Sequence, residues 1–187
     1  MEKRNLSRRK FVATIAAGAG TIIVGKAAGA FAASDQQNGP FQIVTLGKSG
    51  IKTTLLGMGT GFSGYNRSSN ITRAGVADTL IKYAYDKGIR FFDCADNYGT
   101  HPHTARALKG LPREKYTLTT KIWDLPGSLP EPERPEANIV VDRFRKELNT
   151  DYIDLVQLHC LTSGTWTDQH KKQMDIMETL KSKGIIK

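Results

Sequence analysis

Residues 90–99 read RFFDCADNYG, and this stretch decides how the rest of the chain can fold. Its first four residues have the short, aromatic and apolar character of a buried strand, which ends at Asp93. Two further segments of this kind, YTLTTK and YIDLVQLH, end at Lys121 and His159. The steps of 28 and 38 residues between the three ends suit parallel strands joined by helical crossovers, which need roughly 30 residues per unit. The sequence therefore predicts an α/β fold with a parallel sheet.

The ends of these strands carry the residues capable of chemistry. In a parallel sheet the carboxyl ends of all strands open on one face, where α/β folds place their active sites. Asp93, Lys121 and His159 stand at those ends, and Tyr98 follows the first of them closely. Each has an ordinary structural explanation when taken alone, as a cap, a surface lysine or a core residue. Their shared placement favours a catalytic site in which the four side chains converge.

The remaining segments complete a repeating pattern of strands and helices. A hairpin is expected at residues 41–54 around the turn GKSG, and the run LLGMGTG at 55–61 predicts a buried strand that enters a flexible loop. Residues 125–135 are rich in proline and predict a long loop over the site, a candidate substrate lid. Residues 185–187 resemble the approach to a fifth strand. Helices are predicted at Thr72–Lys87, Thr104–Lys109, Glu136–Leu148 and Asp168–Lys183.

The first 32 residues have the pattern of a secretory signal. A basic start is followed by an apolar, small-residue stretch and by AFA at 30–32, a small-x-small cleavage site. The run SRRKFV at 7–12 resembles a twin-arginine signal, which is read by a machinery that exports folded proteins. We therefore expect a periplasmic or cell-envelope protein with a linker at 33–40 and one folded domain at 41–187. The alternative interpretation is a basic amphipathic arm or an uncleaved membrane anchor.

Composition and charge narrow the possible partners. The formal charge is +9, but residues 1–32 hold six of the 27 basic residues and one of the 18 acidic residues, which leaves +4 for the rest. No basic patch is interleaved with aromatic residues, so nucleic-acid binding is not expected. Contact with a membrane is expected only through the signal, because no other segment is apolar enough to span a bilayer.

Two pairs of residues invite a metal or thiol interpretation. His101 and His103 have no third ligand at a suitable spacing, so a loop or helix cap is favoured over a metal site. Cys94 and Cys160 each follow a site residue by one position, where strand alternation points them away from the site. Both are predicted to be packing thiols, and no metal is expected.

The chain from about residue 41 to residue 187 resembles the aldo-keto reductase family. The motifs that carry the resemblance are LGKSG at 46–50, LGMGT at 56–60, FDCADNYG at 92–99, TTK at 119–121 and DYIDLVQLH at 151–159. The resemblance implies a (β/α)8 TIM barrel that transfers hydride between NADP(H), with NAD(H) as the alternative cofactor, and a small carbonyl or alcohol substrate. It assigns the catalytic roles to Asp93, Tyr98, Lys121 and His159.

The same resemblance assigns the binding roles. Gly59, Thr60 and Asp93 line the nicotinamide end of the cofactor, and Trp123 lies at the substrate pocket. The residue types agree with this chemistry, because a carbonyl that accepts hydride develops negative charge and needs a proton donor. Tyr98 is the expected donor, and Lys121 is expected to lower its pKa from near 10.

The length agrees with only part of such a barrel. Eight units need about 250 residues, whereas 155 follow residue 32, enough for the hairpin and about four βα units. We interpret the chain as the N-terminal half of a larger enzyme, so weak or no NADPH binding and no activity are expected from these residues alone, and the alternative is a half-barrel that dimerises. A second function class also stays open, namely a nicotinamide-binding or interaction module without turnover. The sequence leaves the reaction direction undecided.

Overall fold

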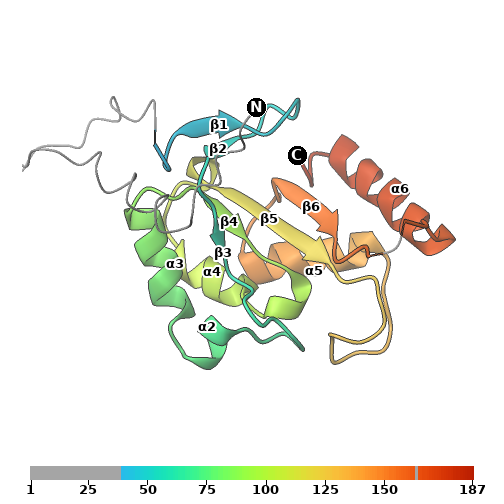
Figure 1. The fold of residues 1–187 in the computed structure, drawn as a ribbon. Helices are drawn as coiled ribbons and strands as arrows, with labels where there is room; N and C mark the ends of the chain where they lie inside the picture. Colours follow the sequence, from blue (N-terminus) through green and yellow to red (C-terminus); the bar gives the residue numbers. More distant parts are fainter. Residues whose placement is uncertain (1–38, 163) are drawn as a thin grey trace, which may run out of the picture. The chain divides into compact units, whose positions relative to one another are not determined.

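The computed structural model describes residues 39–162 and 164–187 (Figure 1). The predicted signal at 1–32 and most of the predicted linker at 33–40 lie outside these residues. The described part opens with a hairpin of β1 (Ile43–Thr45) and β2 (Lys52–Thr54), as predicted. Its turn uses glycines in the left-handed region, with φ of +53° at Gly47 and +75° at Gly50, where a side chain would be strained.

The hairpin is tied to the amino-terminal ends of two strands. The Arg90 backbone amide donates to Thr54 Oγ1 over 2.9 Å, and Thr53 Oγ1 donates to the Arg90 carbonyl over 3.3 Å. Thr117 Oγ1 donates to the Lys52 carbonyl over 3.3 Å. The hairpin therefore covers the end of the sheet opposite to the predicted site.

A four-stranded parallel sheet forms the centre of the fold. Its order is β3 (Met58–Gly59), β4 (Phe91–Asp93), β5 (Thr117–Ile122) and β6 (Leu155–Leu158). The first and last strands are shorter than predicted. Ile153, just before β6, forms a parallel bridge with Ile186, so residues 185–187 run beside the sheet edge in the direction of a fifth strand, as predicted.

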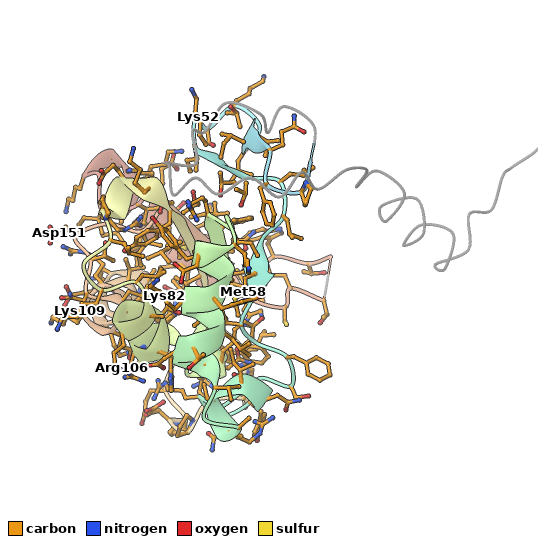
Figure 2. The ribbon with its side chains drawn as sticks, turned by 90° about the vertical axis from the view of Figure 1, so that its left-hand side faces the viewer. Lys52, Met58, Lys82, Arg106, Lys109 and Asp151 are labelled. Carbon is orange, nitrogen blue, oxygen red and sulfur yellow. The ribbon has the colours of Figure 1, made fainter. Side chains whose placement is uncertain are left out.

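The helices lie on one side of the sheet in chain order, with α3 against α4, α4 against α5 and α5 against α6 (Figure 1). Figure 2 shows the α3 and α4 layer in front of the strands, with Lys82 and Arg106 labelled on it. The elements are α2 (Asn70–Arg73), α3 (Ala77–Asp86), α4 (His101–Ala107), α5 (Ala137–Leu148), α6 (Asp168–Ser182) and the 3-10 turns η1 (Asp96–Tyr98) and η2 (Arg113–Lys115).

Two predicted helices have different bounds in the structure. The prediction of a single helix at residues 72–87 is wrong, because Gly75 adopts a φ of +68° and separates α2 from α3. The helix predicted to begin at Thr104 instead begins at His101, where the fixed φ of Pro102 suits the first helical turn.

The two faces of the sheet differ in polarity, because successive strand residues point to opposite faces. Phe92, Leu118, Ile122 and Val156 are buried in one cluster with the inner sides of the helices. Burial of this apolar area stabilises the fold at roughly 25 cal/mol per Å². Members contributed by the helices are Ile81, Ala84, Ala107, Val140, Val141, Phe144, Met177 and Leu180. The other face presents polar residues, and the site lies there.

Within residues 39–162 and 164–187, no helix combines the length and the apolar character needed to cross a membrane.

Candidate active site

Three strands bring the predicted site residues to one edge of the sheet. Asp93 ends β4 and is in register with Thr119 of β5, and Lys121 lies two residues further along β5, on the same face. His159 directly follows β6, and its backbone amide donates to the Ile122 carbonyl over 2.9 Å. The register therefore places all three side chains at the carboxyl end of the sheet.

Lys121 and Asp93 form an ion pair inside the site. Lys121 Nζ donates to Asp93 Oδ1 over 2.5 Å and to the Cys94 carbonyl over 3.0 Å. The lysine side chain is 16% exposed and the aspartate side chain 37% exposed. These two acceptors fix the direction of the ammonium.

Tyr98 reaches the site from η1, the turn after β4. Its hydroxyl lies 3.4 Å from His159 Nε2, and its ring centroid lies 5.2 Å from Lys121 Nζ. Two glycines leave room for the ring: a Cβ added at Gly61 would lie 2.1 Å from Tyr98 Cε2, and one added at Gly64 would lie 2.4 Å from Tyr98 Cδ1. Any side chain at either position would therefore displace the phenol.

The expected effect of Lys121 on the Tyr98 phenol is wrong for this structure. The pKa of Tyr98 is raised above 10, mainly by burial and secondarily by the negative charge of Asp93. The ammonium is bonded to Asp93 and Cys94 and approaches the face of the ring, so the hydroxyl pairs with His159 instead. The phenol is consequently protonated at neutral pH, the state that a proton donor requires.

His159 is neutral at physiological pH. Burial, and after it the positive charge of Lys121, lower its pKa from 6.5 to about 4, against opposing contributions from Asp93 and Asp96. The Trp123 ring packs edge-on against the imidazole with 5.1 Å between ring centroids. Among the described residues, Trp123 Nε1 and His159 Nδ1 are buried polar atoms that have no hydrogen-bond partner.

This shift gives a direct pH prediction. We expect His159 to titrate near pH 4 in the folded chain, because charging the imidazole requires burying a second cation beside Lys121. NMR titration of the histidine ring resonances measures the midpoint, with a His159→Gln variant assigning the signal. A midpoint at the ordinary value of 6.5 would contradict the buried position.

Of the three residues assigned to the cofactor, Gly59 and Thr60 differ in which of their atoms face the site. Gly59 ends β3 beside Asp93, and a Cβ added there would meet no atom within 4 Å. A flat ring could approach this backbone closely. Thr60 is buried, and its hydroxyl donates to the Asp93 carbonyl over 2.9 Å and pairs with Thr100 Oγ1 over 2.8 Å. Its side chain therefore supports the end of β4.

The proline-rich loop at 125–135 is attached to the segments around Tyr98. Asn97 Nδ2 donates to Ser128 Oγ over 3.0 Å, and the Asn66 amide donates to the Ser128 carbonyl over 3.0 Å. Arg67 forms an ion pair with Glu131 over 2.5 Å. The loop thus lies beside the turn that carries the phenol, where the sequence predicts a lid.

Two glycines and an arginine that shape the site were not found by sequence reasoning, whereas Asp96 is expected from the sequence either as an extra polar group of the site or as a loop cap. Gly61 and Gly64 accommodate the Tyr98 ring, and Asp96 anchors the turn that carries it, with 2.8 Å from its Oδ2 to Arg143 Nη2. The glycines are visible in the sequence, but nothing local indicates which ring they face. Asp96 stands within the quoted motif, whereas Arg143 lies 47 residues away on α5.

The predictions for the histidines and cysteines have mixed outcomes. His101 and His103 lie on α4, where His101 pairs with Glu147 and Thr120 and His103 pairs with Asp78, so neither is a cap. Cys94 is fully buried, as predicted for a packing thiol, but Cys160 is exposed, and that prediction is wrong. In the part of the chain that the structure describes, no group of three or more His, Cys, Asp or Glu residues could hold a metal ion.

Comparison with known proteins decides the family. The profile described as "Aldo/keto reductase family" matches residues 55–187, which include all four side chains of the site. The chain belongs to the aldo/keto reductase family. The match begins just before β3 and covers all four strands of the parallel sheet and all five helices of the described part.

Curated relatives support this membership. "Probable aldo-keto reductase 1" of Glycine max is 36% identical over 126 residues, which are 63% of this chain and 36% of the relative. "D-arabinose 1-dehydrogenase" of Saccharomyces cerevisiae is 32% identical over 115 residues, 59% of this chain and 34% of the relative. The chain thus spans about a third of the length of these relatives.

Solved structures of the family show the same fold. The aldo-keto reductase AKR11C1 from Bacillus halodurans in its holo form aligns with a TM-score of 0.59 at 29% identity, over 77% of this chain and 47% of that protein. The aldo-keto reductase MGS-M4 from a Medee basin deep-sea metagenome library gives a TM-score of 0.58 at 25% identity, over 78% and 47%. The hairpin and four parallel strands thus represent about half of a (β/α)8 barrel, as predicted.

Proposed function

We propose that this aldo/keto reductase family member supplies the catalytic side chains of an oxidoreductase that transfers hydride between NADP(H) and a carbonyl or alcohol substrate. One observation carries the proposal: a protonated phenol, Tyr98, lies in one site with the Lys121–Asp93 ion pair and a neutral imidazole, His159. These are the groups that stabilise and protonate an oxygen on which negative charge develops.

The residues present fit a nicotinamide ring at one observed place. The open backbone at Gly59 lies in register with Asp93, so a ring stacked there would lie beside the phenol and the ion pair. When bound, the nicotinamide supplies or accepts hydride at the substrate carbon. Gly59 and Asp93 would contact the ring, and Thr60 would hold the end of β4 in place from behind.

The proposed chemistry of the protein is the movement of one proton. Tyr98 donates its hydroxyl proton to the substrate oxygen beside the Lys121–Asp93 ion pair, and the phenolate that forms is reprotonated from solvent. Asp93 holds the Lys121 ammonium in position. His159 is neutral and contacts the phenol hydroxyl, so it would orient the oxygen without adding a charge. In the reverse direction the Tyr98 phenolate accepts the proton of an alcohol.

The substrate side of the site is proposed to include Trp123. Its ring packs edge-on against His159, and its indole N–H is a buried donor that has no hydrogen-bond partner among the described residues. The names of relatives cover both directions of the reaction, because one is a reductase and the yeast protein is a dehydrogenase of the sugar D-arabinose. We therefore propose a small aldehyde or sugar as the substrate class.

The test is an assay of the full-length protein with NADPH and a small aldehyde, and with NADP and an aldose. We expect a loss or gain of NADPH absorbance that depends on the substrate. Binding of NADPH, followed by its fluorescence, is measured in parallel. Binding without turnover would favour a nicotinamide-binding module. Absence of both NADPH binding and turnover would overturn the proposal.

We also infer that the chain is exported through the twin-arginine route, on the basis of the run SRRKFV at 7–12. A folded state before export suits a protein that acquires a bound cofactor. Replacement of both Arg8 and Arg9 by lysine is expected to retain the chain inside the cell. An unchanged distribution between cell fractions would contradict the inference.

A further inference from the structure

A series of polar contacts, called the contact chain below, runs on the helix side of the sheet from η1, which carries Tyr98, to β5, which carries Lys121. It begins at Asp96, whose Oδ2 accepts from Arg143 Nη2 over 2.8 Å, and Arg143 Nη1 donates to Glu147 Oε1 over 2.9 Å. Glu147 Oε2 lies 2.7 Å from His101 Nδ1, and His101 Nε2 lies 2.8 Å from Thr120 Oγ1. Four hydrogen bonds thus connect η1, α5, α4 and β5.

Both ends of this chain of contacts belong to segments that carry site residues. Asp96 and Tyr98 share the single turn η1, so a shift of Asp96 moves the backbone that holds the phenol. Thr120 directly precedes Lys121 in β5 and points to the opposite face of the strand. The contacts therefore fix the segment of the phenol relative to the strand of the ammonium.

Within the site, the Lys121 ammonium reaches Asp93 and Cys94, which precede η1, and not the Tyr98 hydroxyl. Among the described residues, the Tyr98 hydroxyl is hydrogen-bonded to His159, and the Lys121 ammonium is hydrogen-bonded to Asp93 and Cys94. Tyr98 and Lys121 meet only through a ring contact of 5.2 Å. A contact of this kind holds distance loosely, whereas proton transfer depends on placement within a fraction of an ångström.

Burial makes the polar contacts firm. The side chains of Asp96 and His101 are 2% and 3% exposed, and Thr120 is fully buried. Burial alone would raise the pKa of Glu147, but the bonds to His101 and Arg143 outweigh it and lower the pKa to about 2. Glu147 is therefore charged at neutral pH, and Arg143 is held between two acidic side chains. Charge-assisted hydrogen bonds of this kind are stronger than neutral ones.

We propose that Asp96, Arg143, Glu147 and His101 are positioning residues that hold the Tyr98 phenol in place relative to Lys121. The proposal rests on the proposed function for its effect on turnover, but not for its effect on the geometry of Tyr98. None of the four side chains is assigned to contact the substrate. Their role is exerted through η1 and β5.

The first test is the Asp96→Asn variant, which keeps the shape of the side chain and removes its charge. Because a displacement of about 1 Å can cost about 100-fold in rate, we expect kcat to fall by roughly 10- to 100-fold while KM changes by less than about 3-fold. Glu147→Gln, in the middle of the contact chain and partly exposed, is the second variant and is expected to act in the same direction. It keeps the test decisive if Asp96→Asn does not fold.

The matched control is Asp142→Asn on the same helix. Asp142 is exposed and pairs with Lys146 and Arg145 of α5, outside the contact chain. Asp142→Asn removes one negative charge from α5, as Glu147→Gln does. If turnover is unaltered in Asp142→Asn, the effect of Glu147→Gln is due to positioning and not to a general change in α5.

A spectroscopic measurement separates this inference from the proposed function. In the full chain with labelled tyrosine and histidine rings, NMR resonances of Tyr98 and His159 are expected to shift together in Asp96→Asn and in Glu147→Gln, and to stay unchanged in Asp142→Asn. Absent turnover in the parent chain with these shifts present would overturn only the proposed function. Unchanged resonances of Tyr98 and His159 in both variants would overturn the positioning role.

Discussion

Tyr98→Phe is expected to lower turnover by about 10²- to 10⁴-fold, the usual contribution of a general acid. The phenylalanine ring fits the same space between Gly61 and Gly64, so the fold and the binding of NADPH are expected to persist. Only the hydroxyl that faces His159 at 3.4 Å is lost. Steady-state kinetics with NADPH and an aldehyde, together with NADPH fluorescence, measure the two quantities separately.

The matched control is Tyr83→Phe. Tyr83 lies on α3 with 59% of its surface exposed, away from the carboxyl ends of the strands. It is expected to leave kcat unchanged. A Tyr98→Phe variant with the parent turnover would refute the role of the phenol as the proton donor.

Gly61→Ala is expected to reduce turnover to nearly the level of Tyr98→Phe although it removes no functional group. The new Cβ would lie 2.1 Å from Tyr98 Cε2, well inside the 3.0 Å below which real Cβ contacts are essentially absent. The Tyr98 ring must therefore leave its position. Loss of placement of a reacting group by about 1 Å can cost about 100-fold in rate. The rate is measured under the same assay, and circular dichroism follows the fold.

The control for this substitution is Gly39→Ala, where an added Cβ meets no atom within 4 Å. The double variant Gly61→Ala with Tyr98→Phe is expected to be no slower than Tyr98→Phe alone, because the hydroxyl is already absent. Parent-like turnover in Gly61→Ala would show that the Tyr98 ring does not lie against Gly61.

The order of elements and the edge of the sheet that holds the site could be predicted from the sequence. Strand periodicity at 90–93 and 116–121 reports burial, and polar residues at the strand ends indicate a common edge. The bounds of the helices were less predictable, because apolar spacing continues across Gly75, whereas the positive φ of that residue interrupts the helix. The spacing of apolar residues along the sequence does not reveal a helix break at one residue.

The electrostatics of the site could not be predicted from residue types. An ammonium near a phenol is expected to lower the pKa of the phenol. In the structure the Lys121 ammonium instead points to Asp93 and the Cys94 carbonyl, because it donates hydrogen bonds to both. Burial then dominates and raises the pKa of Tyr98. Likewise the contact between Asp96 and Arg143 joins residues of different elements, so it depends on how α5 packs against the sheet.

The central claim is that Tyr98 and Lys121 act as one catalytic unit, and a kinetic cycle tests it most directly. Tyr98→Phe, Lys121→Met and the double variant are compared by kcat in the full-length protein. Because members of one unit are strongly non-additive, the account predicts that the double variant is no slower than the slower single variant. Losses that multiply in the double variant would show that the two side chains act independently, and would contradict the account.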